Sequence, residues 1–352
     1  RIGGPEATGV SDHSEPFLRQ FLEHCAHGVN AATGGKGAPL DFISYHPKGS
    51  PKFADGHVSG APGDGSSSQG WIVMSVGTQL RAVERGMKLI AGYPEWQHTP
   101  IILGESDPEG CAACQGSQNG YRNGPLYGVS VAEATLRTYE LARKYGVTVE
   151  GAVTWAFEFE DQPAFAGFRE LASNGIDKPV LNVFRLFGMM GGGPSASSAP
   201  GPPLQGAVWL ATESSGALPL ADVVEHSVTG AADVNAVASR NGHKVDVLLW
   251  NYHDADVPAP PAHLLLAIDG LSGTEAAEAE FRVDGEHGNA YRAWQQMGSP
   301  AHPTPEQTQQ LEKAGALEET VPDHPVPVHD GKLVFGLTLP RQGVMLVRLR
   351  ER

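Results

Sequence analysis

"TPIILGESDP" (residues 99–108) is the stretch from which the expected fold follows. Four apolar residues, the last of them Leu103, run into Gly104 and Glu105, and the chain then enters an acidic loop broken by Pro108. A short run that is apolar throughout is typical of a strand covered on both faces, as in a parallel sheet. Glu105 is then either a catalytic group displayed at a strand end or an ordinary surface glutamate where a strand meets solvent.

Outward from this strand, residues 1–190 alternate between strand-like and helix-like segments. The expected strands are "RIGGP" (1–5), "LDFISYH" (40–46), "PIILGE" (100–105) and "GAVTWAF" (151–157). Segments with helical spacing of apolar residues follow them at 14–28, 78–92, 129–146 and 178–190. Four consecutive βα units imply parallel strands joined by right-handed crossovers. A complete (β/α)₈ barrel needs eight units and roughly 250 residues, so this part resembles the back half of a barrel.

Two of the expected helices have well-defined apolar faces. In residues 14–28, Ser14 is the expected cap and Gly28 the expected stop. The apolar face of that helix consists of Phe17, Leu18, Phe21, Leu22 and Cys25. The apolar face of the helix at 78–92 consists of Leu80, Val83, Met87 and Ile90.

The pattern changes after residue 190. "GGGPSASSAPGPPLQG" (191–206) is of low complexity and reads as a linker, and residues 59–70 read as a loop insertion. Beyond the linker, the pattern predicts a hairpin at residues 234–252, with Asn241 and Gly242 in its two-residue turn. Further strands are expected at 263–271, 278–284, 332–340 and 344–352. A capping box at Thr304 and Gln307 predicts one helix there. The predicted division is a partial barrel (1–190), a linker (191–206) and an accessory β-sandwich (207–352).

Composition limits the partners. The formal charge of −15 argues against nucleic acid and anionic membranes, and neutral substrates suit such a surface. No apolar run reaches the length of a membrane helix. Three cysteines do not make a disulfide framework. The chain opens without Met or a visible signal peptide, which suggests a processed or incomplete chain.

Polar side chains gather at the ends of the expected parallel strands, where barrel enzymes carry out their chemistry. These side chains are His46, Lys48, Glu105, Asp107, Glu158, Glu160 and Asp161, with the aromatic residues Trp155, Phe157 and Phe159 beside them. Sugar hydrolysis requires carboxylates, groups that hold ring hydroxyls, and aromatic faces. The alternative is a set of solvated carboxylates with no function at strand ends.

Several motifs resemble those of one enzyme family. "RIGGP", "LDFISYHPKGSP", "ILGESDP", "TWAFEFED", "NGIDKPVLNVFRLF", "LLWNYHD" and "HGNAYRAWQQMGSPAHPTPEQ" follow one another as they do in family 39 of the glycoside hydrolases. That family contains the β-xylosidases and the α-L-iduronidases. The resemblance implies a (β/α)₈ barrel, of which residues 1–190 are strands five to eight, an accessory β-sandwich, and hydrolysis with retention of anomeric configuration.

The resemblance also implies roles for individual residues. Glu105 of "GESDP" occupies the position of the nucleophile, and His46 that of a substrate-contacting histidine. Glu160 and Asp161 fall where carboxylates bind sugar hydroxyls, and Trp155 would supply an aromatic face. Lys48 matches the "HxKG" pattern of iduronidases, in which the lysine helps to hold a substrate carboxylate.

One family motif is absent from the sequence. The acid/base glutamate of the family lies in an Asn-Glu-Pro motif, and the nearest string here, at residues 14–16, is a helix-capping sequence. A retaining mechanism needs two carboxyl groups about 5–5.5 Å apart. We therefore expect the acid/base residue to lie upstream of residue 1, and the chain alone to be inactive.

The expected function is a retaining β-xylosidase that acts on xylo-oligosaccharides without a metal or an organic cofactor. An α-L-iduronidase-like activity is the alternative within the enzyme class, and a carbohydrate-binding fragment without catalysis is the alternative outside it. Cys111 and Cys114 form a metal or redox pair, a disulfide or two thiols. The oligomeric state and the compartment stay open.

Overall fold

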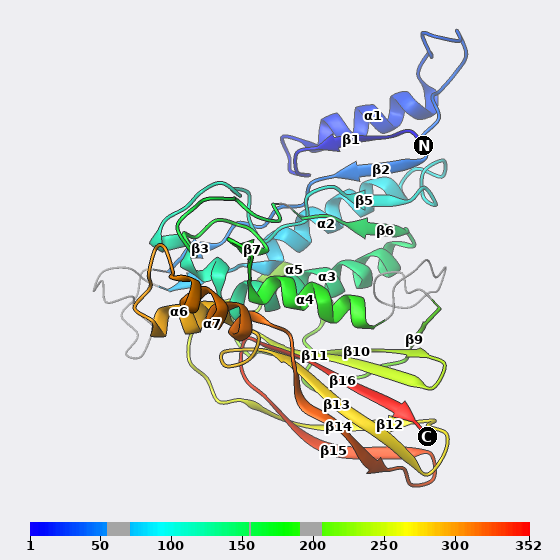
Figure 1. Ribbon diagram of the computed structural model, residues 1–352. Coiled ribbons are helices and arrows are strands. Elements are labelled where there is room, and N and C mark those ends of the chain that lie inside the picture. The colour runs from blue at the N-terminus through cyan, green and yellow to red at the C-terminus, as the bar shows by residue number, and fades with distance from the viewer. Residues whose placement is uncertain (55–70, 155, 191–205) are drawn as a thin grey trace.

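A four-stranded parallel sheet is followed along the chain by a larger antiparallel part (Figure 1). The structure, a computed structural model, describes residues 1–54, 71–154, 156–190 and 206–352. The expected insertion at 59–70 and nearly all of the expected linker at 191–206 lie outside these residues. In Figure 1, helices α3 and α4 separate the parallel strands from the antiparallel ones.

The parallel sheet has the strand order β1-β2-β5-β6. Its strands are β1 (Gly3–Ala7), β2 (Phe42–Tyr45), β5 (Ile101–Leu103) and β6 (Val149–Ala152), and all three pairings are parallel. The helices that follow them are α1 (Glu15–His27), α2 (Val76–Ala91), α3 (Pro125–Tyr145) and α4 (Pro179–Met189). The four predicted βα units are confirmed.

Strand β6 departs from the prediction. It starts before the expected segment at 151–157 and ends at Ala152. We expected every strand to be covered on both faces, but Glu150 and Ala152 are exposed and Val153 is 50% exposed. β6 is an edge of the four-stranded sheet, so one side of it lacks a neighbouring strand in the described chain.

The helix faces follow the predicted spacing with two corrections. Leu80, Val83, Met87 and Ile90 of α2 are fully buried, as predicted. On α1, Leu18 and Leu22 are buried but Phe17 is 58% exposed, because it lies about 100° around the helix from Leu18. Ser14 makes no capping bond to the first turn of α1; its hydroxyl accepts instead from the Ser11 N–H at 2.9 Å. None of the helices in the described part of the chain is long and apolar enough to cross a membrane.

The antiparallel part consists of two sheets that share an apolar core. The six-stranded sheet has the order β14-β13-β16-β11-β10-β9 and the second sheet pairs β12 with β15. The bounds are β9 (Val208–Leu210), β10 (Asp233–Asn241), β11 (Lys244–Tyr252), β12 (Ala262–Asp269), β13 (Glu275–Val283), β14 (Glu319–Pro327), β15 (Lys332–Leu339) and β16 (Gly343–Glu351). Leu249, Met345 and Val347 of the larger sheet pack with Leu333 and Leu337 of the smaller one. All the predicted strands are present.

Local differences from the prediction have clear causes. Asn241 pairs with Lys244, so the hairpin turn is Gly242 and His243 rather than Asn241 and Gly242, and Gly242 takes the required positive φ of 58°. The predicted helix is α7 (Pro305–Gly315), with its capping box confirmed. The short helices α5 (Leu220–His226) and α6 (Ala290–Gln296) were not predicted.

Two buried acidic residues join α2 and α3 to the antiparallel strands. The Asp254 carboxylate accepts from the Val76 N–H at 3.1 Å and from the Tyr252 hydroxyl at 2.6 Å, which holds the start of α2. Glu133 of α3 accepts from the Trp250 indole at 2.5 Å, and burial raises its pKa well above the usual range. These contacts fix the helices, and with them the strand ends that carry the candidate site.

Candidate active site

The carboxyl ends of β1, β2 and β5 meet at one edge of the sheet, because the strands are parallel and neighbouring. Glu6 belongs to the end of β1, while His46 and Lys48 follow β2. Glu105 follows β5, two residues after Leu103. Three successive strands therefore deliver a carboxylate, an imidazole with an ammonium, and a second carboxylate to the same edge.

Lys48 links Glu105 to Asp107. Its Nζ donates to Glu105 Oε2 and to Asp107 Oδ2, the latter at 2.5 Å. The side chains of Lys48 and Glu105 are 19% and 27% exposed, whereas that of Asp107 is fully buried. The ammonium thus offsets the repulsion between two nearby carboxylates, and Glu105 keeps access to the surface.

Asp107 is held from the far side by two residues that come after β6. Its Oδ1 forms an ion pair with Arg169 and accepts a hydrogen bond from the Thr154 hydroxyl. Arg169 is 2% exposed, so this pair is shielded from solvent. A buried carboxylate with three partners is a rigid support for Lys48, and through it for Glu105.

The loops after β2 and β5 are in direct contact. The Gly49 N–H donates to the Asp107 carbonyl at 2.9 Å. A Cβ atom on Gly49 would lie 2.1 Å from the Pro108 carbonyl oxygen, so any side chain at this position would force the loops apart. Gly49 therefore sets the approach that brings Lys48 between the two carboxylates.

Glu6 is a member of this cluster that sequence reasoning missed. Its Oε2 lies 2.7 Å from His46 Nε2, and the same oxygen would be 1.9 Å from a Cβ on Gly104, the residue before Glu105. Its backbone has a positive φ of 55°, unusual for a glutamate. The sequence did contain a signal for it: Glu6 directly follows "GGP" at the end of the first expected strand, as Glu105 stands at the end of its own strand.

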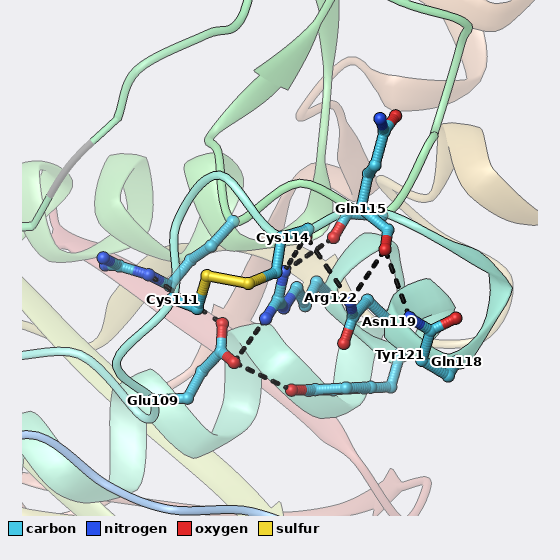
Figure 2. Close-up of a disulfide and its surroundings, with 10 residues drawn as sticks. Glu109, Cys111, Cys114, Gln115, Gln118, Asn119, Tyr121 and Arg122 are labelled. Atoms are coloured by element: carbon cyan, nitrogen blue, oxygen red, sulfur yellow. Dashed lines mark hydrogen bonds and ion pairs between the residues drawn. A yellow bond between two sulfur atoms is a disulfide. The ribbon is translucent and has the colours of Figure 1, made fainter.

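The loop between β5 and α3 is closed by a disulfide between Cys111 and Cys114 (Figure 2). Of the alternatives expected for these two cysteines, a metal or redox pair, a disulfide or two thiols, the structure contains the disulfide. The Arg122 guanidinium donates to the carbonyls of Cys114 at 2.5 Å and Gly167 at 2.8 Å, and forms an ion pair with Glu109. Arg122 and the adjacent Asn123 are buried, so they support the loop.

Glu160 and Asp161 are not brought to this cluster. Both side chains are exposed at a turn, and within the described residues neither forms a hydrogen bond or ion pair with it. Glu158 accepts from the Gly175 N–H at 2.6 Å, and Trp155 lies outside the described residues. The roles expected for Glu160, Asp161 and Trp155 stay predictions.

A further buried ion pair joins Lys178 to Glu170. Lys178 Nζ is 3.0 Å from Glu170 Oε1, and both side chains are almost fully buried. Burial lowers the pKa of Lys178 to about 8 and raises that of Glu170. Glu170 also accepts from the Phe159 N–H at 2.9 Å, which anchors the segment that carries Arg169.

This arrangement suits attack by a carboxylate on a carbon that develops positive charge. Glu105 is accessible and is held by Lys48, and the end of the neighbouring strand carries His46, which is bonded to Glu6.

The sequence profile of "Glycosyl hydrolases family 39" matches residues 1–331. The chain belongs to family 39 of the glycosyl hydrolases.

Two curated relatives differ in activity. The family 39 chain is 24% identical over 381 residues to the α-L-iduronidase of Mus musculus, with 100% of this chain and 52% of the relative covered. It is 22% identical over 355 residues to the β-xylosidase of Caldicellulosiruptor saccharolyticus, with 100% and 60% covered. The chain thus spans only part of the length of both relatives, and its substrate does not follow from them.

Solved structures share the fold at lower identity. A bacterial orthologue of human α-L-iduronidase superposes with a TM-score of 0.71 at 18% identity, covering 99% of the family 39 chain and 55% of that structure. A monomeric β-xylosidase from Caulobacter crescentus CB15 gives 0.65 at 18% identity, with 100% and 61% covered. At this identity the likeness concerns the fold alone.

Proposed function

We propose that the protein is a retaining glycoside hydrolase in which Glu105 is the nucleophile. The observation that carries this proposal is the position of Glu105 after a parallel strand, accessible and bonded to Lys48, in a family 39 chain. One Glu105 oxygen attacks the anomeric carbon and the bond to the leaving oxygen breaks. Water then attacks the same carbon, releases the sugar and restores the carboxylate.

The leaving oxygen needs a proton from a second carboxyl group. This sequence has no Asn-Glu-Pro motif, so we propose that the acid/base residue belongs to a segment outside residues 1–352. With it we propose that the parallel sheet is four strands of a (β/α)₈ barrel and that residues 207–352 are an accessory β-sandwich. His46, Glu160 and Asp161 would hold sugar hydroxyls.

The proposed substrate is a β-xyloside or xylo-oligosaccharide. Two cations of the cluster are already matched by protein carboxylates: Lys48 contacts Glu105 and Asp107, and Arg169 pairs with Asp107. A neutral sugar can enter without displacing these pairs, and it experiences no repulsion from a chain with a formal charge of −15.

Lys48 also favours a second candidate. An α-L-iduronidase-like enzyme would use this ammonium, which is 19% exposed, to bind a substrate carboxylate in exchange for one of its protein partners. Comparing kcat/KM for an aryl β-xyloside and an aryl α-L-iduronide separates the two candidates. Preference for the iduronide would replace the xyloside proposal.

Replacement of Glu105 tests the proposed function. In the full-length protein, Glu105→Ala should abolish nearly all hydrolysis of an aryl β-xyloside, and azide should restore part of it with a product of inverted configuration. The exposed Glu312 of α7 provides the control, because Glu312→Ala removes a carboxylate far from the site and should leave turnover unchanged. Full activity of Glu105→Ala would refute the nucleophile. Sugar binding without turnover by the unmodified protein would favour a carbohydrate-binding role.

A further inference from the structure

A hollow lies between the loops of the parallel part and helix α6. It has a volume of about 380 Å³, which falls within the ~300–1,000 Å³ typical of small-molecule sites. One wall is the short hairpin of β3 (Lys52–Phe53) and β4 (Ile72–Val73), which lies between β2 and α2 in the chain. A second wall is the 3₁₀-helix η1 (Ser117–Asn123), which follows Glu105. α6 closes the third side.

Aromatic side chains come to this hollow from all three walls. They are Phe53, Trp71, Tyr121 and Tyr291. Tyr291 is fixed in place by its stacking on Trp294, with ring centroids 5.4 Å apart at 20°. A Cβ on Gly120 would lie 2.9 Å from the Tyr291 hydroxyl, so glycine permits the close approach of η1 and α6. Flat aromatic faces are suited to the apolar faces of sugar rings.

Polar groups without protein partners also line the hollow. Across the residues that the structure describes, the side chains of Asp256, Trp71 and Gln295 form no hydrogen bond or ion pair. Burial raises the pKa of the Asp256 carboxyl, and a partly buried polar group without a partner is costly. A ligand rich in hydroxyl groups would supply both donors and acceptors to these three side chains.

A series of buried contacts links one wall of the hollow to the residues that hold the proposed nucleophile. Tyr121, whose ring lines the hollow, donates from its hydroxyl to Glu109 at 3.2 Å (Figure 2). Glu109 Oε1 lies 3.8 Å from Arg169, which pairs with Asp107, the partner of Lys48. Glu105 and η1 also belong to the same loop between β5 and α3. The segment after Lys48 reaches the hollow at Phe53, and the segment after Glu105 reaches it at η1. The two loops that carry Lys48 and Glu105 therefore also form two walls of the hollow.

We infer that this hollow is a binding subsite for the distal part of a neutral oligosaccharide whose terminal sugar is cleaved at Glu105. The inference rests on the proposed function for the terminal sugar, but the subsite itself can be tested separately. If the inference is right, substitutions in the hollow weaken the binding of long substrates and leave the binding of short ones unchanged. The walls favour an uncharged ligand for two reasons. Arg292, which also lines the hollow, is paired with Glu286 at 2.8 Å, and burial raises the pKa of Asp256, which disfavours its charged form.

Xylohexaose and an aryl β-xyloside are the probes for the full-length protein. Trp71→Ala removes one aromatic face and should raise KM for xylohexaose about tenfold, the equivalent of one aromatic contact. It should leave KM and kcat for the aryl xyloside unchanged. Phe17→Ala is the matched control: it removes an aromatic ring that is 58% exposed on α1, and it should change neither substrate.

Asp256→Asn and Gln295→Ala provide milder variants, so a folding defect in Trp71→Ala does not remove the test. Each should raise KM for xylohexaose severalfold and spare the aryl xyloside. Equal effects on the two substrates, or no effect on xylohexaose, would overturn the inference while leaving the Glu105 assignment intact. Conversely, a Trp71 effect limited to xylohexaose, together with an active Glu105→Ala variant, would support the subsite and refute the proposed nucleophile.

Discussion

Lys48 Nζ lies 2.5 Å from Asp107 Oδ2, and the same ammonium contacts Glu105. Asp107 is completely buried, so its charge is balanced by protein groups alone: Lys48, Arg169 and the Thr154 hydroxyl. The buried Asp107 carboxylate thus supports the accessible Glu105 carboxylate through Lys48. The support extends from the loop after β2 to residues beyond β6.

Asp107→Ala should destabilise the protein strongly. The substitution removes the shorter of the two ion pairs of the buried Arg169, the longer being its 3.8 Å pair with Glu109, and it removes one of the two contacts of Lys48. Breaking one side of a buried pair costs about 3–5 kcal/mol, and we expect a loss in that range in the free energy of unfolding measured with urea. Asp222→Ala, at an exposed position of helix α5, is the control for loss of an aspartate. A change below about 1 kcal/mol would show that Asp107 does not support the site.

Glu6→Ala should change the orientation of the His46 ring but have little effect on the free energy of unfolding. The Glu6 side chain is 49% exposed, so the free energy of unfolding should change by less than about 1 kcal/mol. Its loss releases the His46 ring, and kcat for an aryl xyloside should fall about tenfold with little change in KM. ¹⁵N spectra of the His46 ring should show that the preference for a proton on Nε2 is lost.

The matched control for Glu6 is Glu95→Ala. It breaks the exposed pair, 3.5 Å long, between Glu95 in the turn after α2 and His27 of α1. This variant should leave kcat and the His46 spectrum unchanged. An unaltered His46 spectrum in Glu6→Ala would contradict the positioning role of Glu6.

The buried Lys178 predicts a pH dependence of stability. Its pKa is about 8 in the folded protein, below the 10.5 that is usual for a lysine, so between these pH values the unfolded chain binds more protons. The free energy of unfolding contributed by Lys178 therefore rises as pH increases from 8 towards 10, by at most about 1.4 kcal/mol per pH unit. The double variant Glu170→Gln/Lys178→Met removes both charges and should lack this rise. Parallel stability curves for the two proteins over this range would contradict the assignment.

Much of the parallel part follows from local sequence signals. The apolar run at Ile101–Leu103 ends at Gly104, and the spacing of Leu80, Val83, Met87 and Ile90 specifies the buried face of α2. These signals depend on neighbours in the chain, so a single sequence contains them. Glu105, His46 and Lys48 could be assigned to one edge because parallel strands end together.

Side-chain contacts between segments far apart in the sequence could not be predicted from such local signals. Nothing near Asp107 in the sequence indicates that Arg169 pairs with it, and nothing near Glu6 indicates His46. Strand β14 was missed because its prolines weaken the strand pattern, although an edge strand tolerates their missing N–H groups. Glu160 and Asp161 were placed at the end of a strand expected to reach residue 157 and given roles by resemblance, whereas β6 ends at Ala152 and both residues are exposed at a turn.

Covalent labelling tests the central claim most directly. A 2-deoxy-2-fluoro-β-xyloside with a dinitrophenolate leaving group reacts readily but yields a slowly hydrolysed glycosyl ester, because the fluorine destabilises the second transition state. If Glu105 is the nucleophile, peptide mass spectrometry of the treated full-length protein should find the fluorosugar on Glu105, and Glu105→Gln should remain unlabelled. A label on any other carboxylate, with Glu105 unmodified, would contradict the account.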